Sequence, residues 1–340
     1  MNKKRWLGVG IAVVLLVISL VVPNYQREKS SWDKELDSIT SSFMSQSNEL
    51  QEIVIEPGDG QNRILHLDLD GTIMAGGSSS MFAPAVYNHD FFLAQLDEVL
   101  EDDTIKAIYF TINTPGGGVY ESAEIRNRIL KIKEERNIPI YVSMLNMAAS
   151  GGYYIAADAT KIYATEETWT GSIGVISQVM DFGGLLERYG IKVHTYASGD
   201  MKTMGSPYKA PTEEEVAIWN ELTKEAYDKF VALVANGRGL SEQEVRTLAD
   251  GRIYTGKQAL ENGLVDELAY KEEVLEGLKT ENSLENAQVF EYSMGNNQFF
   301  NIFNQLSSFN KNDSELAVLK ALLEKQLTSA PTPYYLYGGK

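Results

Sequence analysis

Ser150 is the strongest candidate for a nucleophile in this sequence. It stands in NMAASGGYYIA, where small residues precede it and Gly151 and Gly152 follow it at once. The apolar run that ends near Met144 predicts a strand, and a helix is predicted to begin near Ser150. A serine at a helix N-terminus lies beside unpaired amides and the positive end of the helix dipole, which can stabilise developing negative charge. A simple helix cap suits the same residue, so this motif alone leaves both roles open.

Three consecutive glycines, Gly116 to Gly118, form the second chemical feature. They lie between the apolar run at residues 105–113 and an amphipathic helix predicted over residues 119–135. Glycines at such a turn let backbone N–H groups approach an incoming oxygen, as an oxyanion hole requires. No Gly-Lys-Ser/Thr follows them, which excludes a nucleotide-binding P-loop. A plain tight turn is the alternative for this loop taken by itself.

A serine nucleophile needs a base to accept its proton. The three histidines, His66, His89 and His194, lie in two strand patterns and a polar loop, where an orienting carboxylate is hard to supply. A lysine can act instead when burial or nearby positive charge favours its neutral form, as in serine–lysine pairs. Spacing alone does not choose among the candidate lysines, which are Lys161, Lys192, Lys202 and Lys209.

The elements that must position these residues predict an α/β fold. Short apolar, β-branched runs suit buried strands at residues 63–71, 105–113, 138–144, 161–164 and 191–196. Helical spacing lies between the first four runs, and this alternation implies largely parallel strands. Further along, a capping box at Thr212 and Glu215 predicts the start of a longer helix. The pattern recurs at Ser241 with Glu244 and at Thr255 with Gln258.

Bulk composition limits the possible classes of function. With 340 residues and 44% hydrophobic side chains, the chain can fill a sizeable core. Its net charge of -17 repels phosphate backbones and argues against a role in binding nucleic acid. Without any cysteine the chain can form neither a disulfide nor a thiolate metal site.

The N-terminal residues predict a membrane anchor. Lys3, Lys4 and Arg5 precede an uncharged apolar run at residues 6–22, which is about the length that spans a bilayer. Positive charge stays on the cytoplasmic side, so the N-terminus is expected to be cytoplasmic and the catalytic domain extracytoplasmic in the cell membrane. A cleaved signal peptide is the alternative, but no small-x-small cleavage site follows the run.

Composition divides the chain into four expected parts. Residues 1–25 form the cytoplasmic tip and anchor, 26–62 a polar stalk, 63–280 an α/β catalytic domain, and 281–340 a C-terminal extension with a flexible tail. Within the extension, Phe and other apolar residues recur at helical spacing over residues 299–309. Core packing, an oligomer contact and a membrane-surface helix are all open for this segment.

Four motifs in order resemble those of signal peptide peptidase A, a family of membrane-anchored serine proteases. They are NTPGGGVYESAEI, NMAASGGYYIA, TWTGSIGV and DGRIYTGKQALENGLVDEL, and the match covers roughly residues 64–268. Four co-linear motifs are far more specific than one glycine loop. The resemblance implies an α/β fold of the Clp protease/crotonase-like type, with repeated β-β-α units preceded by one N-terminal transmembrane helix.

The resemblance also implies a role for each site residue. Ser150 corresponds to the nucleophile, Lys202 to the general base, and Ser172 to a serine that hydrogen-bonds and orients the lysine. The amides of Gly117 and Gly151 correspond to the oxyanion hole. It further implies a ring-like homo-oligomer in which Ser150 and Lys202 of one site come from neighbouring copies. No metal or cofactor is implied.

The surroundings of Lys202 fit this assignment. It stands among Met201, Met204 and Gly205 rather than in a run of charges, so we expect partial burial that favours the neutral amine.

One motif indicates a different class of enzyme: Asp68 and Asp70 follow an apolar strand as in haloacid-dehalogenase phosphatases. That class also needs a later acidic pair to complete a magnesium site, which this sequence does not supply, so we interpret both as turn residues.

We therefore expect a membrane-bound serine endopeptidase that degrades hydrophobic peptides such as released signal peptides. It would hold membrane lipid through residues 6–22 and bind no nucleic acid. Two alternatives stay open. A crotonase-like acyl-CoA enzyme would also use paired glycine amides, although the anchor places the domain away from coenzyme A, and a catalytically silent membrane scaffold would keep the fold without a reactive serine.

Overall fold

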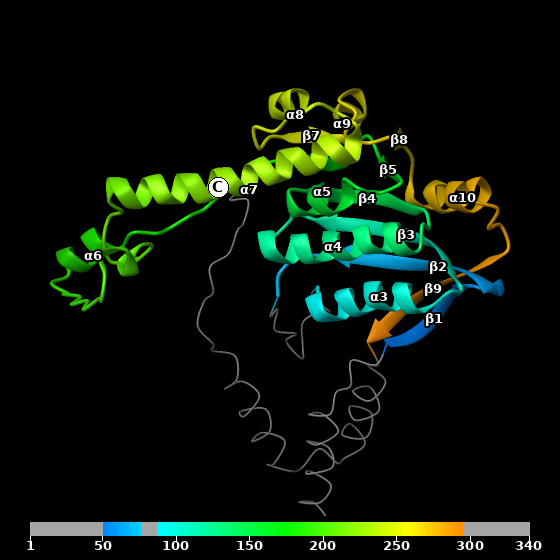
Figure 1. The fold of residues 1–340 in the computed structure, drawn as a ribbon, viewed down its shortest axis with the longest axis horizontal. Coiled ribbons are helices and arrows are strands. Elements are labelled where there is room, and N and C mark those ends of the chain that lie inside the picture. The colour runs from blue at the N-terminus through cyan, green and yellow to red at the C-terminus, as the bar shows by residue number, and fades with distance from the viewer. Residues whose placement is uncertain (1–49, 76–86, 295–340) are drawn as a thin grey trace, which may run out of the picture. The chain divides into compact units, whose positions relative to one another are not determined.

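The computed structural model describes residues 50–75 and 87–294 (Figure 1). The strands are β1 (Leu50–Glu56), β2 (Asp59–Asp70), β3 (Ile105–Thr114), β4 (Ile140–Ala149), β5 (Lys161–Ala164), β6 (Trp169–Gly171), β7 (Ile253–Thr255), β8 (Glu267–Leu268) and β9 (Ala287–Met294). The helices are α3 (His89–Glu101), α4 (Val119–Glu135), α5 (Gly151–Ala156), α6 (Gly183–Arg188), the 3₁₀ helix η2 (Asp200–Thr203), α7 (Glu213–Arg238), α8 (Glu242–Leu248), α9 (Gly256–Glu261) and α10 (Lys271–Glu281).

The described strands form one nine-stranded sheet in the order β1-β9-β2-β3-β4-β5-β8. The strands from β2 to β5 pair in parallel, whereas β1 pairs with β9 in antiparallel fashion. Towards its end β4 also pairs with β6, and β6 pairs with β7. This mixed α/β architecture with a parallel-rich sheet confirms the predicted fold class at that level.

Helices cover both faces of the central sheet. Successive residues of a strand point to opposite faces, and the two buried clusters follow this alternation. One cluster contains Phe110 and Val142 together with residues of α3 and α4, which Figure 1 shows lying side by side over the sheet. The other contains Tyr109 and Tyr141 packed with Leu278 of α10. The central strands are therefore buried on two sides, as their nearly continuous apolar sequence predicted.

Several predicted helix starts are confirmed. Thr212 caps α7 and accepts from the amide of Glu215, whose side chain accepts in return from the Thr212 amide. Ser241 with Glu244 and Thr255 with Gln258 form the same reciprocal pairs at α8 and α9. Each box satisfies amides that have no partner inside the helix.

The sheet reaches beyond the expected bounds of the catalytic domain on both sides. β1 begins at Leu50, inside the expected stalk, and β9 lies inside the expected C-terminal extension. The two strands pair with each other, and β9 also pairs with β2. Pairing between segments more than 200 residues apart gives no local signal, so the sequence pattern around either strand could not reveal it.

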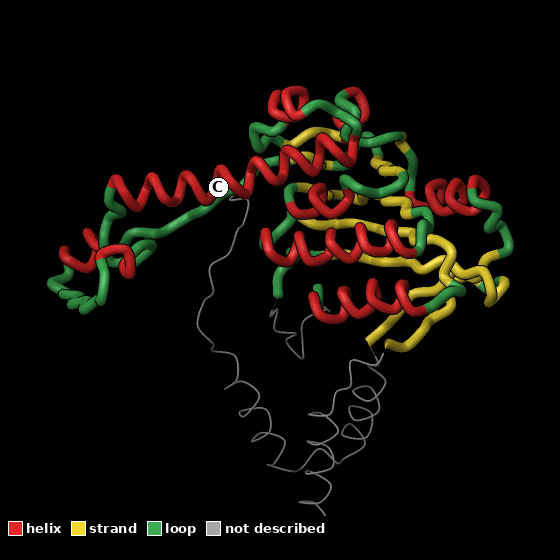
Figure 2. Tube along the Cα trace, viewed as in Figure 1, coloured by secondary structure: helices red, strands yellow, loops and turns green. Residues whose placement is uncertain are grey.

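The prediction of a strand at residues 191–196 is wrong. All six residues are exposed, and none belongs to a strand of the described chain. They lie in a segment that leaves the sheet after β6 and returns along α7 (Figure 2). Its alternating apolar residues are typical of a strand, but a strand requires a neighbour to accept and donate its backbone hydrogen bonds.

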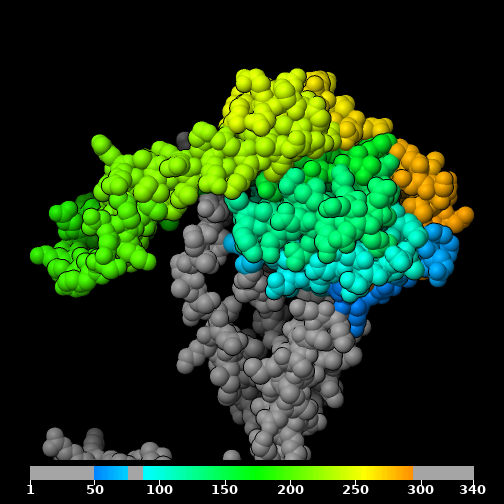
Figure 3. All heavy atoms as spheres, in the orientation of Figure 1, coloured from blue at the N-terminus to red at the C-terminus, as the bar shows by residue number. Residues whose placement is uncertain are grey.

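We call residues 174–223 the arm, which comprises this segment, α6, η2 and the first part of α7. Figure 3 shows the arm projecting from the body that contains the sheet. Large apolar side chains are exposed along it, although such side chains usually pack in a core or an interface. They include Ile176, Met180, Phe182, Leu185, Tyr189, Ile191, Val193, Tyr196 and Tyr208.

Some predicted segments lie outside the described residues. These are the anchor at residues 6–22, the tail, and the Phe-rich segment at residues 299–309. Within residues 50–75 and 87–294, every helix is too short or too polar to cross a bilayer.

Candidate active site

Ser150 lies at a sharp corner between β4 and α5. Its backbone has φ of 51° and ψ of -115°, a left-handed conformation that L-residues other than glycine rarely adopt. The Ser150 amide donates to the Gly171 carbonyl at 2.8 Å, and its carbonyl accepts from the Tyr154 amide at 2.8 Å. Such strain persists only when surrounding bonds hold it, and it concentrates at functional sites.

The glycine loop after β3 touches this corner. A Cβ added at Gly116 would lie 2.7 Å from the Gly151 nitrogen, and one added at Gly151 would lie 3.2 Å from the Gly117 nitrogen. Only residues without a side chain allow backbone to approach backbone so closely. Among the described residues, no acceptor is recorded for the amides of Gly117 or Gly151. The corner therefore brings the amides of Gly117 and Gly151 close together, neither with an acceptor in the described part of the chain.

Ser172 is held close to Ser150 through the backbone. It directly follows Gly171, the residue whose carbonyl accepts from the Ser150 amide. Ser172 has φ of 49°, and its own amide donates to the Arg252 carbonyl at 2.8 Å. Three of the residues predicted for the site thus lie where the ends of β4 and β6 adjoin. They are Ser150, Gly151 and Ser172.

Lys202 is the predicted site residue that the chain does not bring to this corner. It lies in η2, within the arm, in the segment that joins α6 to α7 away from α5 (Figure 1). Its side chain is exposed, so the expectation of partial burial is wrong for the single chain. The reason is that Met201 is itself exposed and Met204 is only half-buried, so these neighbours do not enclose it.

The other candidate lysines differ in their partners. Lys161 donates to both carboxylate oxygens of Glu281, and this hydrogen bond raises the pKa of Lys161, which favours the charged ammonium. Lys209 forms an ion pair of 2.6 Å with Glu215. Lys161 is therefore a poor general base, and the Lys209 amine is engaged by a carboxylate. Lys192 and Lys202, both in the arm, have no recorded ion pair with a described residue.

His66, His89 and the aspartate pair have hydrogen-bond partners other than Ser150. His194 is exposed on the arm. His66 contacts Glu291 and Thr111, at 3.3 and 3.0 Å. His89 contacts the Tyr87 hydroxyl and Glu124. Asp68 accepts from Thr111 and Asp70 accepts from Asn113, so their carboxylates join neighbouring strands.

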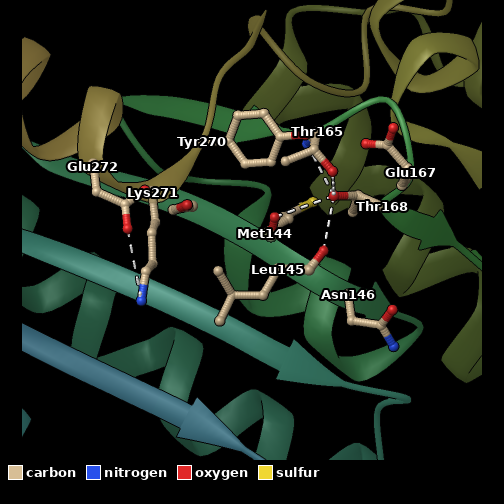
Figure 4. A pocket seen from close by; sticks show the side chains of 10 residues that line it. Met144, Leu145, Asn146, Thr165, Glu167, Thr168, Tyr270, Lys271 and Glu272 are labelled. Atoms are coloured by element: carbon tan, nitrogen blue, oxygen red, sulfur yellow. Dashed lines mark hydrogen bonds and ion pairs between the residues drawn. The ribbon is translucent and has the colours of Figure 1, made fainter.

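A cavity of about 470 Å³ lies beside β4, at the fork where β5 and β6 diverge from it (Figure 4). Residues of β4, of the loop between β5 and β6, and of the start of α10 line it. None of the predicted site residues lines this cavity. Figure 4 shows Thr168 at its wall, bonded to the carbonyls of Met144 and Leu145, a contact that sequence analysis missed.

A parallel α/β sheet that ends in a strained serine beside two free amides is the arrangement expected of a serine hydrolase. The family model of peptidase family S49 matches residues 132–285. Over its full length the chain is 43% identical to "Putative signal peptide peptidase SppA" of Enterococcus faecium, and the alignment covers 100% of both chains. The chain belongs to peptidase family S49, and it is a serine protease.

Two further comparisons are more distant. "Serine protease SPPA, chloroplastic" of Arabidopsis thaliana is 32% identical over 175 residues, which cover 51% of this chain and 26% of that protein. Among solved structures, a ClpP1 mutant from Listeria monocytogenes has a TM-score of 0.41 and 18% identity, over 62% of this chain and 94% of that one.

Proposed function

We propose that this protein is a membrane-anchored endopeptidase that cleaves hydrophobic peptides, such as released signal peptides, with a dyad of Ser150 and Lys202. The observation that carries the proposal is the strained Ser150 corner beside the free amides of Gly117 and Gly151. The substrate class is supported by the name of the Enterococcus faecium relative. Anchoring is supported by the uncharged apolar run at residues 6–22.

In this mechanism the Ser150 Oγ attacks the carbonyl carbon of a peptide bond while neutral Lys202 takes the hydroxyl proton. The carbonyl oxygen becomes an oxyanion and accepts hydrogen bonds from the amides of Gly117 and Gly151. The C–N bond then breaks, and the Lys202 ammonium protonates the leaving amine. Water hydrolyses the resulting ester, with Lys202 as base again, and Ser172 orients the lysine throughout.

The base comes from a neighbouring copy in a ring-like homo-oligomer. This part of the proposal is supported by the exposed position of Lys202 on the arm and by the apolar side chains around it. An interface formed by the arm would bury those side chains. It would also remove water from Lys202, which favours the neutral amine that the mechanism needs.

The finer fold assignment is the Clp protease/crotonase-like type. It is supported by short extended pieces that follow the main strands at one edge. Ile73, after β2, bridges Gly117, after β3, in parallel, and the last residues of β4 pair in parallel with β6. In this assignment each main strand, its short continuation and the following helix would make one β-β-α unit.

Hydrolysis of a short apolar peptide ester by wild type, Ser150→Ala and Lys202→Ala tests the dyad. The proposal requires that both variants stay folded and lose activity. No hydrolysis by the wild type would favour a silent scaffold, and a loss confined to Ser150→Ala would indicate another base.

Co-expression of the two inactive variants tests whether sites are shared. If Ser150 and Lys202 of one site come from neighbouring copies, random mixing in a ring leaves roughly a quarter of the sites with both residues intact. Activity should therefore return to that level in the mixed oligomer. If both residues come from one chain, the mixture stays inactive and the shared site is refuted.

A further inference from the structure

The short strand β6 and the residue before it form hydrogen bonds with the end of β4 through side chains as well as through the backbone. Thr168, directly before β6, and Thr170, in its middle, are fully buried. The Thr170 Oγ1 donates to the Ala148 carbonyl at 2.7 Å. The Thr168 Oγ1 lies 2.8 Å from the Leu145 carbonyl, the bond drawn in Figure 4. Two hydroxyls thus bind the segment of β4 that leads directly into Ser150.

This segment of β4 exchanges its partner strand before it reaches Ser150. Its pairing with β5 ends at Ser143, and its pairing with β3 shifts register between Ile112 and Thr114. From Met147 onward, β6 is the strand that pairs in regular register with β4 on that side. The buried bond from the Thr170 hydroxyl therefore adds to the pairing of β4 with β6 at the place where the backbone must enter its strained turn.

β6 is itself anchored on its far side, so it can resist movement. Thr170 pairs with Tyr254 of β7, and Gly171 pairs with Ile253. Beyond β6, the Ser172 amide donates to the Arg252 carbonyl. A strand fixed on one side can hold the strand on its other side in a conformation that would otherwise relax.

We propose that Thr170 is a positioning residue for the nucleophile: its hydroxyl, by holding the Ala148 carbonyl, fixes the Ser150 Oγ against the oxyanion donors. The inference rests on the proposed function of Ser150. Thr170 itself touches no reacting atom. Without its hydroxyl, the residue two positions before Ser150 loses a bond, and the strained corner gains freedom to shift. A displacement of about 1 Å at a reacting group can lower the rate by about 100-fold.

The test compares Thr170→Val, which removes the hydroxyl and nearly keeps the volume, with Thr170→Ser, which keeps the hydroxyl. We expect kcat for the apolar peptide ester to fall by about 10- to 100-fold in Thr170→Val, with KM changed by less than about twofold. Thr170→Ser should keep kcat within about threefold of wild type. A merely structural role would instead lower the melting temperature and leave kcat per folded enzyme unchanged.

Thr111→Val is the matched control. Thr111 is also a buried threonine of the sheet, and its hydroxyl donates to Asp68 rather than to β4. This variant should lose stability without losing kcat. If Thr170→Val does not fold, Thr170→Ala and Thr170→Ser repeat the comparison with smaller side chains, and only the serine variant should keep kcat.

The inference is overturned if folded Thr170→Val keeps kcat within about twofold of Thr170→Ser. The same holds if folded Thr170→Ala does so. Ser150→Ala distinguishes this from a failure of the proposed function. If Ser150→Ala is inactive while Thr170→Val is fully active, the positioning role alone is wrong. If Ser150→Ala still hydrolyses the ester, both proposals fall.

Discussion

Replacing Gly117 with alanine should disable the proposed oxyanion site without altering Ser150 or Lys202, the residues of the proposed dyad. A Cβ at this position would lie 1.9 Å from the Ile73 carbonyl oxygen and 2.8 Å from the Ile73 nitrogen. Real Cβ atoms stay at least 3.0 Å from such atoms, so the loop must move by about 1 Å. Both obstructing atoms belong to the backbone, which cannot rotate away as a flexible side chain would.

The movement acts directly on the proposed donor. Two backbone bonds hold the loop against Ile73: the Ile73 amide donates to Gly116 at 2.9 Å, and the Gly118 amide donates to Ile73 at 2.8 Å. Gly117 lies between them, so its amide must turn or shift when the loop is displaced. Loss of one oxyanion donor typically costs about 100- to 1,000-fold in kcat. At the lower end this corresponds to about 2.7 kcal/mol of transition-state stabilisation.

The assay is steady-state hydrolysis of the apolar peptide ester, with the melting temperature of each variant measured in parallel. Gly277→Ala in α10 is the control, because an added Cβ there meets no atom within 4 Å. We expect Gly277→Ala to keep wild-type kcat and Gly117→Ala to lose at least about 100-fold while folded. A folded Gly117→Ala enzyme within about threefold of wild-type kcat would refute the oxyanion role of this amide.

Two further predictions concern stability. The hydrogen bond from Lys209, with that from the Thr212 amide, lowers the pKa of Glu215 below its ordinary value of 4.5, so the ionised carboxylate stabilises the folded arm. The free energy of unfolding in urea should therefore be higher for wild type than for Glu215→Gln, with the full difference above about pH 5. This difference should shrink as pH falls below 4.5. A difference that stays unchanged in acid would contradict the prediction. Tyr153→Phe removes the fully buried hydroxyl that donates to Leu264 at 2.8 Å, and it should lower the free energy of unfolding by about 1–3 kcal/mol. A loss below about 0.5 kcal/mol in the same assay would show that the Leu264 carbonyl finds another donor.

Local signals were enough to predict the centre of the molecule. The strand before Ser150, the glycines after β3 and the capping boxes all depend on residues only a few positions apart. The same holds for the corner itself, because small residues on both sides of Ser150 are required for its close contact with Gly116. The sequence could therefore indicate a strand, a tight turn and a helix start in the right order.

Non-local relations could not be predicted in this way. Thr168 and Thr170 lie about 20 residues from the β4 carbonyls that they bind, and nothing in TWTGS indicates which strand will be its neighbour. The alternation at residues 191–196 predicted a strand because apolar alternation usually means one buried face, whereas this segment is exposed on the arm. The position of Lys202 depends on where the arm points, which no local pattern encodes.

The arm also holds its shape by its own contacts, which bears on how it could deliver a base. The Phe182 amide donates to the Pro207 carbonyl, and the Ser177 and Thr223 hydroxyls meet at 2.8 Å. α7, which runs from the arm back to the body, has 26 residues and is therefore about 39 Å long.

At its inner end α7 meets α5, the helix that begins directly after Ser150. A Cβ at Gly237 would lie 2.2 Å from the Ala157 carbonyl oxygen, so the two backbones are in direct contact. Because α7 is long and packs against α5 at one end, a small rotation of α7 at that end becomes a large displacement of η2 at the other. If Lys202 serves a neighbouring copy, the accuracy of that remote site therefore depends on the packing of Gly237 against the C-terminal end of α5, the helix that begins after Ser150.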